Sequence, residues 1–224
     1  MRIHTYENKD TLTPENALTY LKEGNLRFVN NIRVNRDLLQ LVDQYSTGQF
    51  PFAAILGCSD SRVPVELIFD QGLGDLFVVR LAGNIASTNA IGSLEFSCKV
   101  LGSKIIVVLG HTECGAVKSA CDSVELGNVT SVLKHIEPAI ALEKEIQNNR
   151  NSKNKEFVNR ILHHNLDYQI ETILDQSDIL REMFFQHQIA IVGALYDIKT
   201  GLVSFYDNAA QKYRERALMR SAMG

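Results

Sequence analysis

Two short polar stretches, each placed directly after an apolar run, constrain the fold of this chain most strongly. The run from Phe52 to Gly57 is followed by Cys58-Ser-Asp-Ser-Arg62, and the run from Lys104 to Gly110 is followed by His111-Thr-Glu-Cys114-Gly115. Such apolar runs are typical of strands that are buried on both faces of a parallel sheet. The carboxyl ends of neighbouring parallel strands meet at one edge, where these sheets bind ligands. The sequence therefore predicts that two thiols, an imidazole and a carboxylate lie in one crevice.

The rest of the pattern predicts strands that alternate with helices. Strands are expected at about 52–57, 76–80, 104–110, 189–196 and 202–206. Helices are expected at about 14–31, 87–101, from 116 onward, at 130–148 with a break near Pro138, at 154–175 and at 177–186. This alternation predicts an α/β fold, in which helices flank a mostly parallel sheet of four parallel strands plus an antiparallel edge strand.

The chain is interpreted as a single domain over residues 1–224, with an N-terminal helical arm of about 1–45. The helix at 14–31 precedes the first strand by some distance and lies outside the alternating core. We therefore expect it to pack on a partner subunit, with packing on its own domain as the alternative.

Composition excludes several function classes. Lys and Arg number 23 against 26 Asp and Glu, and this net charge of -3 argues against a nucleic-acid partner or an anionic membrane surface. No apolar run approaches the roughly 20 residues that span a bilayer. The first ten residues are polar and lack a signal-peptide core, and four cysteines in a chain of this length do not indicate a disulfide framework. We therefore expect a cytoplasmic protein.

The expected crevice has the ligand types that zinc prefers. Cys58, His111 and Cys114 supply two sulfurs and one nitrogen for a tetrahedral site, and one Zn²⁺ per chain is expected. The fourth position remains for water or for Asp60, and an open position is typical of catalytic rather than structural zinc. The N–H of Gly115, at the start of a helix, could bind an anion or a polarised oxygen.

Asp60 and Arg62 lie two residues apart on an irregular loop, where they can form a carboxylate–guanidinium pair. Arg62 would hold Asp60 ionised and turned away from the metal. One carboxylate oxygen would then accept the proton of zinc-bound hydroxide and orient the attacking lone pair. Released by Arg62, Asp60 could instead occupy the fourth zinc position. A pair that only braces the loop is the alternative.

Three motifs, taken together, closely resemble the β-class carbonic anhydrases: Cys58-Ser-Asp-Ser-Arg-Val-Pro64, Phe77-Val-Val-Arg80-Leu-Ala-Gly-Asn84 and Gly110-His-Thr-Glu-Cys-Gly-Ala116. The match runs from about Gln49 to Val117 and extends more weakly to the N-terminal helix and to 189–196. It implies reversible hydration of carbon dioxide to bicarbonate and a proton, with zinc bound by the two cysteines and the histidine and with an Asp60–Arg62 catalytic dyad.

The resemblance also implies a homodimer or homotetramer whose pocket lies at the subunit interface. Gln49 matches a glutamine whose amide contacts substrate across that interface. Phe77, Ala82 and Phe96 match positions of the pocket wall, and an apolar wall suits carbon dioxide, which carries no charge.

One departure from the family pattern bears on regulation. Some bacterial members have a tryptophan three residues before the first ligand, in a bicarbonate site that switches the aspartate onto zinc. Here that position is Ile55 and the chain contains no tryptophan, although Arg80 matches another residue of that site. We therefore expect Asp60 to be paired with Arg62 at neutral pH. A hydrolase of COS or CS₂ on the same scaffold, and a non-enzymatic zinc-binding structural or regulatory protein, remain the alternative functions.

Overall fold

Five strands form one sheet in the order β2-β1-β3-β4-β5. The strands are β1 (Ala53–Gly57), β2 (Leu76–Arg80), β3 (Ile105–His111), β4 (Ala190–Tyr196) and β5 (Val203–Tyr206). The first four run parallel to their neighbours, and β5 pairs antiparallel with β4 at the edge. The predicted mixed sheet is confirmed. Every residue of β1 and β3 is buried, which explains the uninterrupted apolar runs.

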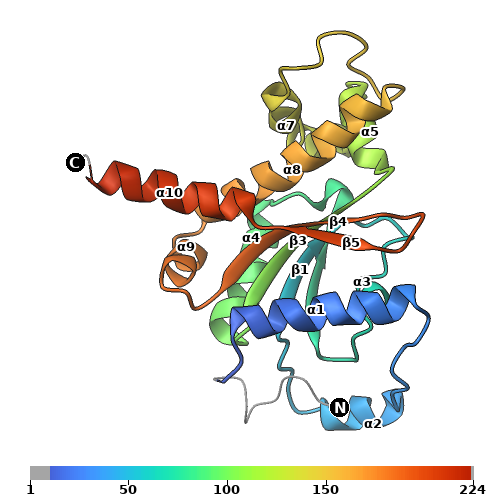
Figure 1. Cartoon of the computed structure of the whole chain (residues 1–224), viewed down its shortest axis with the longest axis vertical. Coiled ribbons are helices and arrows are strands. Elements are labelled where there is room, and N and C mark those ends of the chain that lie inside the picture. The colour runs from blue at the N-terminus through green and yellow to red at the C-terminus, as the bar shows by residue number, and fades with distance from the viewer. Residues whose placement is uncertain (1–10, 223–224) are drawn as a thin grey trace.

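Helices cover both faces of this sheet (Figure 1). The computed structural model describes residues 11–222, with the following helices. They are α1 (Pro14–Val29), α2 (Leu38–Gln44), α3 (Val65–Ile68), α4 (Thr88–Glu95), α5 (Gly115–Cys121), α6 (Gly127–Lys134), α7 (Glu137–Leu142), α8 (Lys155–Gln176), α9 (Asp178–Phe185) and α10 (Asn208–Ala222), with a 3₁₀ turn η1 (Ala82–Asn84) and a π-helical segment η2 (Phe96–Val100). In Figure 1, α1 crosses one face of the sheet, while α10 extends away from the body of the molecule.

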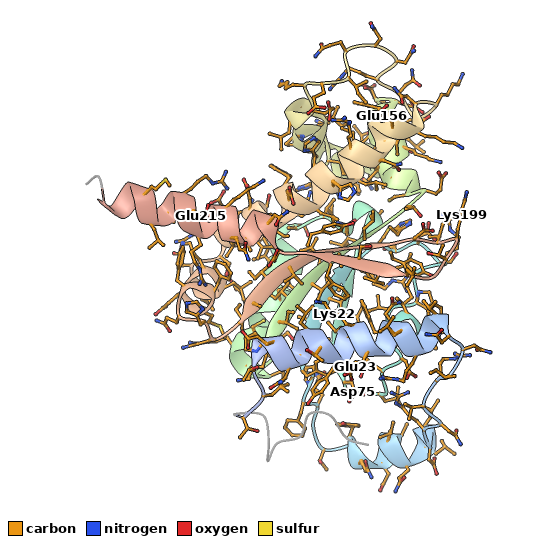
Figure 2. The ribbon with its side chains drawn as sticks, viewed as in Figure 1. Lys22, Glu23, Asp75, Glu156, Lys199 and Glu215 are labelled. Atoms are coloured by element: carbon orange, nitrogen blue, oxygen red, sulfur yellow. The ribbon has the colours of Figure 1, made fainter. Side chains whose placement is uncertain are left out.

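Two apolar cores lie on the two faces of the sheet. On one face, Leu21 of α1 packs in a cluster with Ile55 of β1 and Val107 of β3. On the other face, Ile170 of α8 packs in a cluster with Val108 of β3. Charged side chains lie on the outside of the helices, as Figure 2 shows for the exposed Lys22, Glu23, Glu156 and Glu215.

Capping residues place the helix ends where local chemistry predicts them. The side chains of Thr13, Ser87 and Asn154 accept backbone N–H groups at the starts of α1, α4 and α8. Pro138 lies in the first turn of α7, where its missing N–H costs nothing, so the predicted break separates α6 from α7.

The N-terminal arm contains one helix that the sequence analysis did not predict. Leu38, Leu41 and Val42 of α2 are spaced to share one helix face, but none of the residues of this short helix is buried in its own chain. By contrast, α1 packs on the sheet of its own chain through Ala17 and Leu21, which was the alternative in the sequence analysis. Its packing on a partner stays a prediction for the opposite face, where Leu26 is 54% exposed.

The first ten residues, on which the signal-peptide prediction depended, lie outside the described residues. Within residues 11–222, no helix is long and apolar enough to cross a membrane.

Candidate metal centre

Three buried side chains converge where β1 and β3 end. Cys58 directly follows β1, His111 is the last residue of β3, and Cys114 precedes the first residue of α5. Gly57 lies opposite Leu109 in the parallel pair, so both strands end at the same edge of the sheet. The ligand atoms of the three residues all lie within 4.8 Å of one another, and the two sulfurs are 4.0 Å apart.

The donor set fits a tetrahedral metal ion. His111 Nδ1 lies 2.9 Å from the carbonyl oxygen of Thr112, which can only accept, so Nδ1 carries the proton and Nε2 carries the free lone pair. That Nε2 is buried and has no hydrogen-bond partner in the described part of the chain, which is costly for a polar atom unless it serves as a ligand. Zinc–sulfur bonds of about 2.3 Å at a tetrahedral angle place two sulfurs about 3.8 Å apart, close to the observed separation.

The two sulfurs are electrostatically coupled. The Cys114 thiol donates a hydrogen bond that lowers the pKa of Cys58, and the N–H of Gly83 donates to the same sulfur at 3.4 Å. The hydrogen bond to Cys58, burial and the negative charge of the Cys58 sulfur together raise the pKa of Cys114. One thiolate is therefore favoured before any cation binds, and a bound cation favours the second.

Asp60 is held by Arg62 through both carboxylate oxygens. Arg62 Nε and its backbone N–H each donate to Oδ1 at 2.9 Å, and Nη2 donates to Oδ2 at 2.7 Å. These bonds hold the pKa of Asp60 well below its usual range. Its Oδ2 lies 3.8 Å from His111 Nε2, so the carboxylate borders the ligand cluster while it is paired with Arg62.

The structure also gives Arg80 a place in this site that the sequence analysis did not anticipate. Its Nε donates to the carbonyl of Cys58 at 3.0 Å, and its Nη2 donates to the carbonyl of Asp60 at 2.6 Å. The guanidinium thus ties the Cys58–Asp60 loop to the end of the edge strand β2. The available signal was a cation at the carboxyl end of a strand, at the edge where the ligands were expected.

Arg62 joins the two ligand loops as well, because its Nη2 lies 3.3 Å from the carbonyl oxygen of Glu113. Sequence analysis also missed Gly83 and two buried amides of α8, Asn165 and Gln169, which hydrogen-bond around the turn η1. The signal for the two amides was their polar character within an otherwise apolar helix stripe.

Only two of the expected pocket residues lie beside the ligands of the same chain. Ala82 begins the turn η1, next to Gly83, and Gly115 directly follows Cys114. Both residues are exposed, and a Cβ at Gly115 would meet nothing within 4 Å, so its backbone is open to small molecules.

The other three expected pocket residues lie elsewhere in the chain. Gln49 precedes β1, so it lies at the end of the sheet where the parallel strands begin, whereas Cys58 lies at the end where they finish. Phe77 pairs with Ala54, four residues before Cys58, which corresponds to about 13 Å along the strand. The rings of Phe77 and Phe96 pack against each other, with centroids 6.3 Å apart.

Comparison with known proteins agrees with this geometry. Residues 53–203 match the family model described as "Carbonic anhydrase". "Carbonic anhydrase 2" of Mycobacterium tuberculosis is 36% identical over 203 residues, which covers 87% of this chain and 94% of that protein. The solved structure of the β-carbonic anhydrase CcaA is 28% identical with a TM-score of 0.65, covering 77% of this chain and 87% of CcaA. A tetrameric β-carbonic anhydrase from Sordaria macrospora is 27% identical with a TM-score of 0.66, covering 75% and 86% of the two chains.

Proposed function

This chain belongs to the β-class carbonic anhydrases, whose general reaction is the hydration of carbon dioxide, and from that premise we propose that it works with one zinc ion per chain, bound by Cys58, His111 and Cys114. The observation that carries this proposal is the buried Nε2 of His111, which has no hydrogen-bond partner among residues 11–222 and lies beside two sulfurs at a near-tetrahedral separation. Sulfur and imidazole ligands favour zinc over magnesium or calcium, which prefer oxygen. When bound, zinc supplies the Lewis acidity that lowers the pKa of water towards about 7.

We assign Asp60 the task of orienting the reacting water. Both of its oxygens are occupied by Arg62 on one side, which leaves a lone pair of Oδ2 on the side of His111. Because Arg62 keeps the pKa of this carboxyl low, Asp60 is a weak base but a constant hydrogen-bond acceptor. Its role is therefore to point the lone pair of water at carbon dioxide rather than to remove a proton.

Arg62 and Arg80 hold this acceptor in position. Arg62 connects the side chain of Asp60 to the carbonyl of Glu113 on the second ligand loop, and Arg80 holds the Asp60 carbonyl from β2. A carboxylate fixed from both sides loses little freedom when substrate binds, which is the benefit of a preorganised site.

We further propose that two chains complete each pocket, in a homodimer or homotetramer. Gln49 lies where β1 begins, and Phe77, with Phe96 packed against it, lies about 13 Å along the sheet from Cys58, so a second copy is the proposed source of these groups. The N-terminal arm supports a partner, because it exposes seven large apolar side chains between residues 26 and 42, with Leu39 exposed by 82%. These are Leu26, Val29, Ile32, Val34, Leu38, Leu39 and Val42.

Within such a pocket, Ala82, Phe77 and Phe96 would form an apolar wall for carbon dioxide, and Gln49 and the N–H of Gly115 would contact the oxygens of substrate or bicarbonate. The proposed compartment is the cytoplasm, which is supported by the four free thiols of the chain.

The decisive experiment is Asp60→Asn, measured by stopped-flow hydration of carbon dioxide together with metal analysis. We expect stoichiometric zinc and a turnover reduced by about 100-fold or more, because the amide cannot accept from water and bond both donors of Arg62 in the same way. Asp178→Asn is a matched control, since it breaks another Asp–Arg pair, on α9, away from the metal.

Three outcomes would contradict parts of this proposal. Protein without stoichiometric zinc would exclude the metal site, and an Asp60→Asn variant with normal turnover would exclude the orienting role. Rapid hydrolysis of CS₂ without hydration of carbon dioxide, measured side by side, would assign a different substrate to the same site.

A further inference from the structure

Two buried amides interrupt the apolar inner face of α8. Asn165 and Gln169 are each only 1% exposed, although their neighbours Leu166 and Ile170 belong to the core. Burial of an amide is unfavourable unless its polar atoms find partners. The partners of these two side chains therefore indicate what the amides do.

Most of those partners belong to the turn η1 and the residues after it. Asn165 Nδ2 donates to the carbonyl of Gly83 at 3.1 Å, and the N–H of Ala86 donates to Gln169 Oε1 at 2.7 Å. The two amides are joined, because Gln169 Nε2 donates to Asn165 Oδ1 at 2.9 Å. Gln169 Nε2 also donates to the carbonyl of His135 at 3.1 Å. The two amides thus hold the segment from Gly83 to Ala86 at its first carbonyl and at its last N–H.

The residue held in this way contacts a metal ligand. The N–H of Gly83 points at Cys58 Sγ, 3.4 Å away, while its carbonyl is bound by Asn165. Gly83 has φ +72°, and a Cβ there would lie 2.7 Å from Ile136 Cδ1. The backbone of Gly83 therefore lies between the side chain of Ile136 and the side-chain amide of Asn165.

We propose that Asn165 and Gln169 are positioning residues for the metal centre, which hold the turn η1 so that the Gly83 N–H donates to the Cys58 sulfur and strengthens metal binding. This inference rests on the proposed zinc site. A donated N–H balances part of the negative charge of a thiolate and restricts its orientation, so less must be reorganised when the metal binds. Groups that support metal ligands in this way typically change metal affinity by about 10- to 100-fold when they are removed.

The test is zinc affinity, measured by competition with a chromophoric chelator. Asn165→Ala and Gln169→Met should each bind zinc about 10- to 100-fold more weakly than the wild type and lose it faster. Asn25→Ala is the matched control. Asn25 is also buried and makes three side-chain bonds to backbone, to Ile68, Gly201 and Val203, in the cluster on the α1 face of the sheet. This variant should lose stability and keep wild-type zinc affinity.

A second measurement uses the wild-type protein, so it does not depend on a variant that folds. In protein loaded with ¹¹³Cd, the amide proton of Gly83 should show scalar coupling to the metal through the Cys58 sulfur. In Gln169→Met that coupling should weaken.

The outcomes separate the two proposals. A wild type that binds no zinc contradicts the metal site itself. If the wild type binds zinc and both α8 variants have the same zinc affinity as the wild type, only the positioning role is overturned. The same holds if the Asn25→Ala control loses as much zinc affinity as the α8 variants. Absence of the Gly83 coupling in the cadmium protein also overturns it.

Discussion

Replacement of Gly83 by alanine perturbs one position at which backbone conformation, packing and the metal centre meet. Two separable costs are expected. The positive φ of +72° disfavours any residue with a Cβ, by about 1–2 kcal/mol. The new Cβ would also lie 2.7 Å from Ile136 Cδ1 and 3.3 Å from Ala116 Cβ, which is closer than van der Waals contact.

The packing cost follows from the surroundings of the clash. Ile136 is fully buried in the cluster that contains Cys58 and Cys114, so its side chain can move only by displacing that core. Overpacking of this kind costs about 1–3 kcal/mol. The lower conformational entropy of the unfolded alanine chain returns about 0.4–1 kcal/mol. The free energy of unfolding should therefore fall by about 1–5 kcal/mol.

Two variants separate the costs. Gly102 also has a positive φ, +87°, but a Cβ there meets nothing within 4 Å, so Gly102→Ala reports the backbone cost alone. Ile136→Val removes the clashing Cδ1, so Gly83→Ala should cost about 1 kcal/mol less in that background than in the wild type.

The assay is urea unfolding followed by circular dichroism, at one protein concentration and with saturating zinc, because binding of metal or subunits shifts apparent stability. The reasoning is refuted if Gly83→Ala costs no more than Gly102→Ala. It is also refuted if Ile136→Val leaves the cost unchanged.

Other perturbations test other parts of the molecule. Arg80→Gln should lower kcat for hydration while the zinc content stays stoichiometric, because the carbonyl of Cys58 loses the donor Nε of Arg80. An unchanged kcat would show that Arg80 is not needed to position this loop. Asp70→Asn should cost about 3 kcal/mol in urea unfolding at pH 7, because Asp70 is buried and paired with Arg27 and Arg36. Burial raises the pKa of Asp70, but the hydrogen bonds and charges of the two arginines outweigh burial, so the pKa of the folded protein is lowered. The stabilisation from Asp70 is therefore complete above about pH 4 and is lost as the pH falls further. The stabilities of the wild type and the variant should accordingly converge in acid. Burial raises the pKa of Cys98 to about 12, so a thiol reagent at pH 8 should modify it only after unfolding, as mass spectrometry would show.

Much of the fold follows from local signals in the sequence. The fully buried strands β1 and β3 had uninterrupted apolar runs, and the predicted starts of α1, α4 and α8 agree with the structure within about one residue. The short helix α2 escaped prediction, because its seven residues are too few to establish a helical period, although Leu38, Leu41 and Val42 share one face. The antiparallel edge strand β5 was predictable from the hairpin turn Lys199-Thr200-Gly201, which joins it to β4.

The chemistry of the candidate centre was also set by residue type and short spacing. Cys58, His111 and Cys114 lie at or just after the ends of strands that any parallel arrangement brings to one edge, and Asp60 and Arg62 are close enough in sequence to pair. By itself, then, the sequence determined the donor atoms, the acid and its partner, because these depend on interactions within a few residues of two strand ends.

Tertiary structure decided which groups support those donors and which cannot reach them. Gly83 and Asn165 are 82 positions apart, and no local periodicity reveals that an amide of α8 binds the turn beside Cys58. Gln49 lies where β1 begins, at the end of the sheet opposite Cys58, His111 and Cys114 of its own chain. Support for a site depends on how distant segments pack against one another, which short-range patterns do not encode, so only the folded chain identifies it.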